Sequence, residues 1–152
     1  MLTRWLVGVL LVVVSALPSH ADGDFLEPEQ AFRFSAKLSS GGVLEVRYLI
    51  ADGYYMYRDR FLFDVEPGTV VLGAARFPPG QWHEDEFFGR SEIFRGDVTI
   101  EIPIVSGMEH GQTIRLVAIS QGCADAGICY LPTTQTMDLM LLGSFGATTE
   151  ER

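Results

Sequence analysis

Two cysteines carry the chemistry that this sequence offers. Cys123 and Cys129 are the only cysteines of the chain, and a bond between them would close a ring of seven residues. Paired thiols form a disulfide in an oxidising compartment and can exchange it with the thiols of other proteins. A ring this small stabilises a fold by only about 2 kcal/mol in the chain-entropy account. The short spacing therefore favours a reversibly reduced disulfide over one whose role is to stabilise the fold.

A structural bridge and a metal site are the alternatives. Small secreted proteins commonly use a cysteine pair for stability, so a structural bridge stays open as a second interpretation. A structural zinc site needs four ligands, and no histidine or third cysteine lies near this pair in the sequence. We therefore predict no metal and no cofactor.

The N-terminal residues predict export. Arg4 precedes an apolar run over residues 5–17, and small residues around Ala21 suit cleavage by a signal peptidase. The run is shorter than the roughly 20 residues that a transmembrane helix needs. We therefore predict a signal peptide over residues 1–21, a domain over residues 22–142 and a flexible tail over residues 143–152.

Charge argues against nucleic acid as a partner. Without the predicted signal peptide, 10 basic and 20 acidic residues remain, which gives a formal charge of -10. The excess of acidic residues would repel a polyanion such as a nucleic acid. The acids are scattered along the chain, a pattern typical of a soluble surface.

The segments that must position the cysteines alternate apolar and polar residues at the period of a β-strand. In residues 44–50, for example, all the even-numbered residues are apolar, and the charged Glu45 and Arg47 lie between them. About seven short strands are expected, at 32–34, 44–50, 54–57, 61–65, 98–104, 114–118 and 137–141. Glycine and proline turns separate them, and at most one helical turn is expected near residues 28–31. This pattern predicts an all-β fold, an immunoglobulin-like antiparallel β-sandwich.

One segment departs from the strand pattern. Residues 81–92 combine acidic and aromatic side chains without an apolar face. The segment is either a surface loop whose aromatic rings pack back onto the core, or a lid or recognition loop held by the scaffold. The histidine within it, His83, lies either at the approach to such a lid or on the surface, and a catalytic role is not expected of it.

Three motifs together resemble a known family. Residues 52–58, 82–93 and 121–130 match, in order and spacing, the N-terminal periplasmic domain of the thiol:disulfide interchange protein DsbD. The resemblance covers nearly all of the predicted mature chain. It implies a periplasmic location and an immunoglobulin-like fold in which the two cysteines occupy neighbouring strands of a hairpin.

The resemblance also implies roles for particular residues. Cys129 would form the disulfide with partner proteins, and Cys123 would resolve it. Tyr55 and Tyr57 would lie beside the cysteines, and Phe87 would shield the sulfur atoms. The family's cap loop would correspond to Asp85, Glu86, Phe87, Phe88 and Gly89. Carboxylates of the cap near Cys129 would disfavour its thiolate by like-charge repulsion.

The implied function is a relay of electrons. The domain would accept electrons from a thioredoxin-like donor linked to a membrane electron transporter, and would reduce a periplasmic disulfide isomerase or other thioredoxin-fold acceptors. The sequence has no Cys-x-x-Cys motif of its own, so the donor is expected to come from another polypeptide. The rival function is an immunoglobulin-like periplasmic binding module or chaperone with a structural disulfide.

Overall fold

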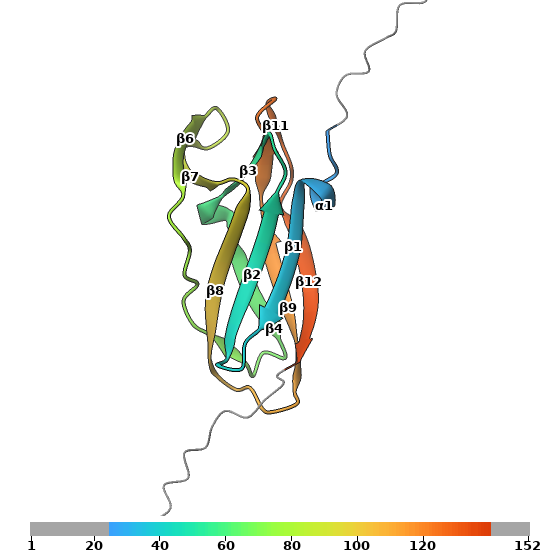
Figure 1. Cartoon of the computed structure of the whole chain (residues 1–152). Coiled ribbons are helices and arrows are strands. Elements are labelled where there is room, and N and C mark those ends of the chain that lie inside the picture. The colour runs from blue at the N-terminus through green and yellow to red at the C-terminus, as the bar shows by residue number, and fades with distance from the viewer. Residues whose placement is uncertain (1–24, 141–152) are drawn as a thin grey trace, which may run out of the picture.

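The structure is a computed structural model, and it describes residues 25–140. One helical turn, α1 (Pro28–Ala31), precedes a domain made of strands, with a short 3₁₀ turn at Arg58–Arg60 (Figure 1). The strands are β1 (Phe32–Leu38), β2 (Val43–Ile50), β3 (Tyr54–Tyr57), β4 (Leu62–Glu66), β5 (Val71–Leu72), β6 (Gln81–Asp85), β7 (Gly89–Phe94), β8 (Asp97–Ser106), β9 (Thr113–Ser120), β10 (Gly122–Ala124), β11 (Ile128–Cys129) and β12 (Thr133–Met140).

The first sheet has four antiparallel strands in the order β1-β2-β8-β5. Leu44, Val46 and Tyr48 of β2 are buried, as the alternation in the sequence predicts. Ile100 and Ile102 of the neighbouring β8 are buried beside them. Because successive side chains of a strand point to opposite faces, one face of this sheet is apolar and the other carries the charged residues.

The second sheet has three antiparallel strands in the order β12-β9-β4. It packs face to face against the first sheet, and Ile114 and Leu116 of β9 join the core formed by β2 and β8 (Figure 1). Each such side chain contributes about 1.5–3 kcal/mol when it is fully buried. The prediction of an all-β, immunoglobulin-like antiparallel sandwich is confirmed.

A third sheet lies at one end of the sandwich and carries the cysteines. Its order is β11-β10-β3-β7-β6, so β3 pairs with the cysteine-bearing strand β10 on one side and with β7 on the other. The β6–β7 hairpin and the β10–β11 hairpin therefore stand at the same end of the molecule (Figure 1). Two segments that are far apart in the sequence meet here because both are attached to β3.

The acidic and aromatic segment is a β-hairpin, which corrects the expectation of a loop. Residues 81–85 and 89–93 pair in continuous antiparallel register, and only residues 86–88 form the turn. Both faces of β6 carry polar side chains, so hydrophobic periodicity could not identify the strand. The described residues contain more strands than the seven that were expected, because the hairpin of β6 and β7 lacks an apolar period and β5, β10 and β11 are only two or three residues long.

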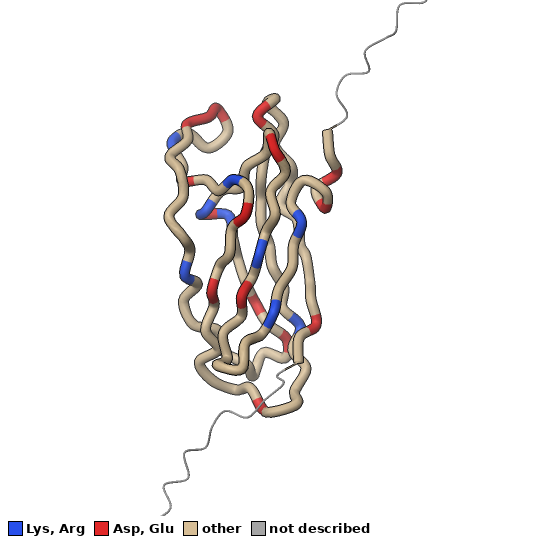
Figure 2. The backbone as a smooth tube through the Cα atoms, in the orientation of Figure 1, with Lys and Arg blue, Asp and Glu red and all other residues tan. Residues whose placement is uncertain are grey.

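Acidic residues mark the end of the molecule that carries the cysteines. Figure 2 shows acidic positions at the turn between β6 and β7 and at the tip of the β10–β11 hairpin. The predicted signal peptide, residues 1–21, and the predicted tail, residues 143–152, lie outside the described residues. Within residues 25–140, no helix has the length and apolar character needed to cross a membrane.

Candidate functional site

The two cysteines face each other across the hairpin of β10 and β11. Cys123 and Cys129 are direct partners in the antiparallel register, with Cα atoms 4.0 Å apart, and they form a disulfide. The backbone amide of Gly127 donates to the carbonyl of Ala124 at 3.0 Å and closes the turn between the strands. The placement on neighbouring strands agrees with the family resemblance.

Gly122 allows the cysteine hairpin to approach β3. A Cβ atom at this position would lie 2.5 Å from the carbonyl oxygen of Tyr55 and 2.5 Å from the ring of Phe32. No other residue fits there without moving the backbone of β3 or the packed ring. The glycine before Cys123 therefore sets the depth at which the disulfide lies.

The two sulfur atoms differ in accessibility. Cys123 is fully buried, in a cluster with Tyr55, Tyr57 and Ile93. Cys129 is only partly buried and packs against the edge of this cluster. A sulfur must be reached in line by an attacking thiolate, so Cys129 is the more accessible target.

Two tyrosines and a carboxylate adjoin the disulfide. The hydroxyl of Tyr57 lies 3.3 Å from Sγ of Cys123 and 3.9 Å from Sγ of Cys129. It donates a hydrogen bond of 2.6 Å to Oδ2 of Asp85, and the hydroxyl of Tyr55 donates to the same oxygen at 3.1 Å. The cap is thus connected to the sulfur atoms through a phenol.

Electrostatics keep these groups in defined protonation states. Burial would raise the pKa of Asp85, but hydrogen bonds from the Tyr57 hydroxyl, the amides of Phe88 and Phe87 and the Tyr55 hydroxyl together hold the pKa below its usual range. Burial, followed by the hydrogen bond to Asp85, raises the pKa of Tyr57 strongly. Asp85 is therefore an ionised acceptor near neutral pH, and Tyr57 is a protonated donor.

Asp85 also folds the turn of the cap. Its Oδ1 accepts hydrogen bonds from the backbone amides of Phe87 and Phe88, both at 2.9 Å. Gly89 ends the turn with a φ of 66°, in the left-handed region that glycine adopts without strain. One carboxylate therefore holds the turn with one oxygen and the tyrosines with the other.

Asp85 should make the stability of the domain sensitive to acid. Because its pKa is lower in the folded protein than the usual 3.8, its contribution is fully present above that value and is lost as the pH falls through the folded value. We expect the difference in unfolding free energy between the unmodified protein and Asp85→Asn to be constant above about pH 5 and to shrink in more acidic solution. Urea denaturation followed by circular dichroism between pH 2 and pH 7 measures this difference.

The exposed Asp59 supplies the control for the acid experiment. Its side chain is 69% exposed and lies in the same domain. Asp59→Asn should leave the acid limb of the stability curve unchanged. A constant difference for Asp85→Asn down to pH 2 would contradict the anchoring role of this carboxylate.

The two cap phenylalanines occupy different environments. Phe88 packs against the cluster around Cys123, with its ring 4.7 Å from that of Tyr57 and the guanidinium of Arg60 4.2 Å from its centre. Phe87 is 43% exposed and lines a cavity of about 310 Å³ between the cap and the tip of the cysteine hairpin. The exposed Glu86 lines the same cavity.

Two further residues adjoin the site: His83, whose place the sequence left open, and Arg95, which the sequence did not identify. His83 contacts the ring of Tyr55 with centroids 4.7 Å apart, and its Nε2 lies 3.6 Å from Oδ2 of Asp85. Arg95 donates to both carboxylate oxygens of Asp125 at 3.0 and 2.8 Å, and its guanidinium lies 5.0 Å from the ring centre of Tyr55. The strand period places His83 on the same face as Asp85, a signal that becomes useful only once residues 81–85 are known to be a strand.

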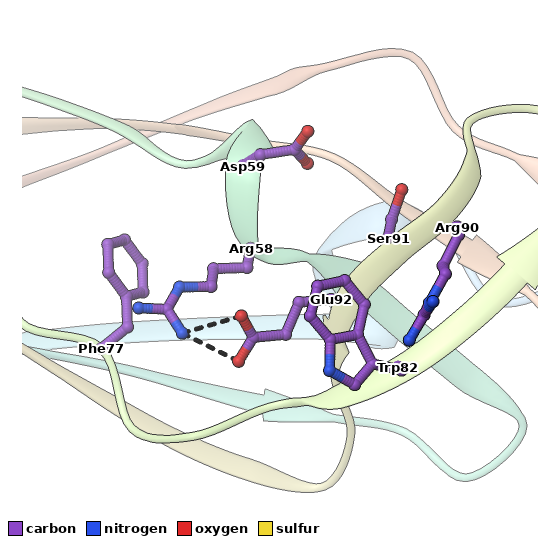
Figure 3. A pocket seen from close by; sticks show the side chains of 7 residues that line it. All are labelled: Arg58, Asp59, Phe77, Trp82, Arg90, Ser91 and Glu92. Carbon is purple, nitrogen blue, oxygen red and sulfur yellow. Dashed lines mark hydrogen bonds and ion pairs between the residues drawn. The ribbon is translucent and has the colours of Figure 1, made fainter.

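A second cleft lies beside the cap hairpin but is separate from the sulfur atoms. It has a volume of about 450 Å³, and Figure 3 shows Trp82 and Arg90 on one side and the ion pair of Arg58 with Glu92 on the other. Neither cysteine nor Asp85 lines it. Within residues 25–140, no group of three or more histidine, cysteine or acidic side chains is arranged to hold a metal ion.

Comparisons with known proteins agree on one family. The family profile described as thiol:disulfide interchange protein DsbD, N-terminal, matches residues 22–141. The DsbD of Ralstonia nicotianae is 43% identical over 129 residues, which are 83% of this chain and 21% of that protein. DsbD 1 of Pseudomonas aeruginosa is 43% identical over 117 residues, which are 77% of this chain and 20% of that protein. The chain thus spans about a fifth of the length of these curated relatives.

Solved structures show the same relationship. The crystal structure of the Neisseria meningitidis DsbD N-terminal domain in the reduced form superposes with a TM-score of 0.70 at 35% identity, over 76% of this chain and 89% of that one. The complex between the DsbD N-terminal and PilB N-terminal domains of the same organism gives a TM-score of 0.64 at 36% identity, over 76% of this chain and 87% of that one. The profile match includes the cysteine hairpin, the identity to curated relatives and the shared fold agree with it, and the chain belongs to the family of DsbD N-terminal domains.

Proposed function

We propose that this domain is a periplasmic thiol:disulfide exchange relay that works through the Cys123–Cys129 disulfide. The observation that carries the proposal is a disulfide with one buried and one accessible sulfur, placed beneath a cap hairpin in a member of the DsbD N-terminal family. A disulfide that served only to stabilise the fold would contribute little free energy with such a small ring. A relay gains from having one sulfur that a partner can reach.

The reaction begins with attack on the accessible sulfur. A thiolate of the electron donor attacks Sγ of Cys129, the S–S bond breaks, and the bonding electron pair remains on Sγ of Cys123. The second thiol of the donor then resolves the mixed disulfide, which leaves the domain with two thiols and the donor with a disulfide. The reduced Cys129 attacks the disulfide of an acceptor in the same way, and Cys123 resolves that intermediate.

Tyr57 is suited to assist the breaking of the bond. Its hydroxyl is 3.3 Å from the sulfur that becomes a thiolate, and its raised pKa keeps it a hydrogen-bond donor. A thiolate buried without a donor would be costly, so a hydrogen bond to Cys123 lowers the barrier to exchange. The tyrosine strand therefore contributes to chemistry as well as to packing.

The cap hairpin, formed by β6 and β7, is proposed to control which molecules reach the disulfide. Asp85 ties the turn to Tyr55 and Tyr57, and the exposed Phe87 extends from this turn beside the cysteine hairpin. A docking partner that displaces the turn would expose Cys129, whereas small oxidants would meet the apolar ring. The shielding role of Phe87 rests on the family resemblance and on its position beside the cavity.

The proposed partners follow from the family. A thioredoxin-like domain linked to a membrane electron transporter would supply electrons, and a periplasmic disulfide isomerase or other thioredoxin-fold proteins would accept them. A related DsbD N-terminal domain forms a complex with the PilB N-terminal domain. This precedent supports direct docking between this domain and another folded protein.

Reduction without unfolding is the test of this function. We expect thioredoxin, kept reduced by its reductase and NADPH, to reduce the disulfide while the circular dichroism spectrum stays unchanged. Loss of the small ring removes only about 2 kcal/mol, so the double variant Cys123→Ala, Cys129→Ala should also remain folded at room temperature. A disulfide that resists thioredoxin, or a domain that unfolds when reduced, would indicate a structural bridge and favour the binding module.

A further inference from the structure

The hydroxyl of Tyr57 has one proton, and its two nearest side-chain acceptors are Oδ2 of Asp85 and Sγ of Cys123. In the disulfide state the hydroxyl donates to Oδ2 of Asp85 at 2.6 Å, and the hydroxyl oxygen lies 3.3 Å from Sγ of Cys123. A disulfide sulfur is a weak acceptor, whereas a thiolate carries a full negative charge. Attack on Cys129 therefore changes which of the two acceptors competes better for this proton.

Transfer of this hydrogen bond takes the shorter of two donors from Oδ2 of Asp85, which keeps only the Tyr55 hydroxyl at 3.1 Å. The side chain of Asp85 is only 10% exposed, so water cannot readily replace the Tyr57 hydroxyl. A charged group that loses a buried hydrogen bond is destabilised. Unless another donor compensates, this cost opposes the turning of Tyr57 toward the thiolate.

His83 is placed to compensate. Its Nε2 is 3.6 Å from Oδ2, the same oxygen that Tyr57 would leave, and an approach of about 0.5 Å would make a hydrogen bond of ordinary length. The ring contact with Tyr55 keeps the imidazole beside the carboxylate. The two side chains share one face of β6, so the small movement needs no change of backbone.

Among the interactions that the structure describes, the only hydrogen-bond donors to this oxygen are the hydroxyls of Tyr57 and Tyr55, and the other groups around His83 are acceptors or donors bound elsewhere. Glu84, Glu86 and Asp125 line the same cavity, and all three are acceptors. The guanidinium of Arg95 lies over the ring of Tyr55 and is bound to Asp125. Ser91, opposite His83 in β7, donates to the carbonyl of Phe88.

We propose that His83 is a positioning residue for the exchange reaction, which donates to Oδ2 of Asp85 when the Tyr57 hydroxyl turns to the Cys123 thiolate. The inference rests on the proposed relay function and adds a residue to its machinery. The imidazole touches neither sulfur nor partner. It acts by releasing the tyrosine hydroxyl from the carboxylate, so that the leaving thiolate gains a hydrogen bond without an uncompensated charge at Asp85.

Matched variants of His83 test the proposal. His83→Phe keeps a ring against Tyr55 but removes the N–H, whereas His83→Gln keeps an N–H that can reach the carboxylate. We expect His83→Phe to slow the reduction of the disulfide by dithiothreitol about five- to ten-fold, because the rate depends on the stability of the leaving thiolate. His83→Gln should retain most of the rate. His83→Leu serves as a second variant without an N–H, should His83→Phe fold poorly by circular dichroism.

Two further measurements separate positioning from packing. In a Cys129→Ser background, thiolate absorbance at 240 nm should show Cys123 titrating at higher pH with His83→Phe than with His83→Gln. In a Tyr57→Phe background, His83→Phe should have no further effect on the rate, since no hydroxyl remains to be released. Equal rates for His83→Phe and His83→Gln, or an undiminished effect without the Tyr57 hydroxyl, would overturn the proposal. These results would not contradict the proposed relay function. That function is contradicted only if the disulfide of the unmodified protein cannot be reduced in the folded domain.

Discussion

Cys123→Ala is expected to accumulate a mixed disulfide with a thioredoxin-like protein, and Cys129→Ala is expected to form almost none. The reason is accessibility, because Cys129 is partly exposed whereas Cys123 is fully buried beneath Tyr55 and Tyr57. A thioredoxin that lacks its resolving cysteine, with the remaining thiol activated by 2-nitro-5-thiobenzoate, is a suitable probe. Release of the yellow thiolate gives the rate, and non-reducing electrophoresis gives the product. We expect a rate difference of about ten-fold or more.

Denaturation supplies the control for this experiment. In 8 M urea both variants carry one exposed thiol, so their rates should converge if burial is the cause of the difference. Equal rates in the native state would remove the distinction between the two sulfur atoms. A faster reaction of Cys129→Ala would reverse the assigned roles of attacking and resolving cysteine.

Phe87→Ala is expected to expose the reduced cysteines with little loss of stability. The ring of Phe87 is 43% exposed, so its removal should destabilise the domain by well under the roughly 3–5 kcal/mol of a buried phenylalanine. If the ring shields Cys129, iodoacetamide should alkylate the reduced Phe87→Ala variant about five-fold faster or more than the unmodified domain, because the Cys129 thiol is then more accessible. Mass spectrometry at timed intervals measures the rate, and urea denaturation measures the stability.

Phe88→Ala is the matched comparison within the same turn. Its ring packs on Tyr57 and under the guanidinium of Arg60, so its loss should lower the unfolding free energy by about 1–3 kcal/mol, less than for a fully buried ring. These two results together would identify Phe87 as the movable cover and Phe88 as the fixed base of the turn. If only Phe88→Ala accelerates alkylation, the cover is Phe88 and the role assigned to Phe87 is wrong.

The sandwich could be predicted from the sequence because its strands are amphipathic. Val46 and Ile100 are buried at the positions that two-residue alternation indicates, and the glycine and proline turns separate the strands. The cap hairpin could not be predicted as strands, since Trp82 and His83 leave β6 without an apolar face. It is held instead by backbone pairing with β7 and by the attachment of β7 to β3.

By itself, the sequence determined the fold class, the redox pair and the family, because alternation, cysteine spacing and three long motifs are local properties of the chain. Only the tertiary structure decided which sulfur is accessible and which groups adjoin it. Tyr57, Asp85 and Cys123 lie far apart in the chain and meet through the pairing of β3 with both hairpins. Burial of Cys123 depends on that packing, which no local pattern of residues could reveal. His83 and Asp85 share a face because residues 81–85 form a strand, and no apolar alternation marks that strand.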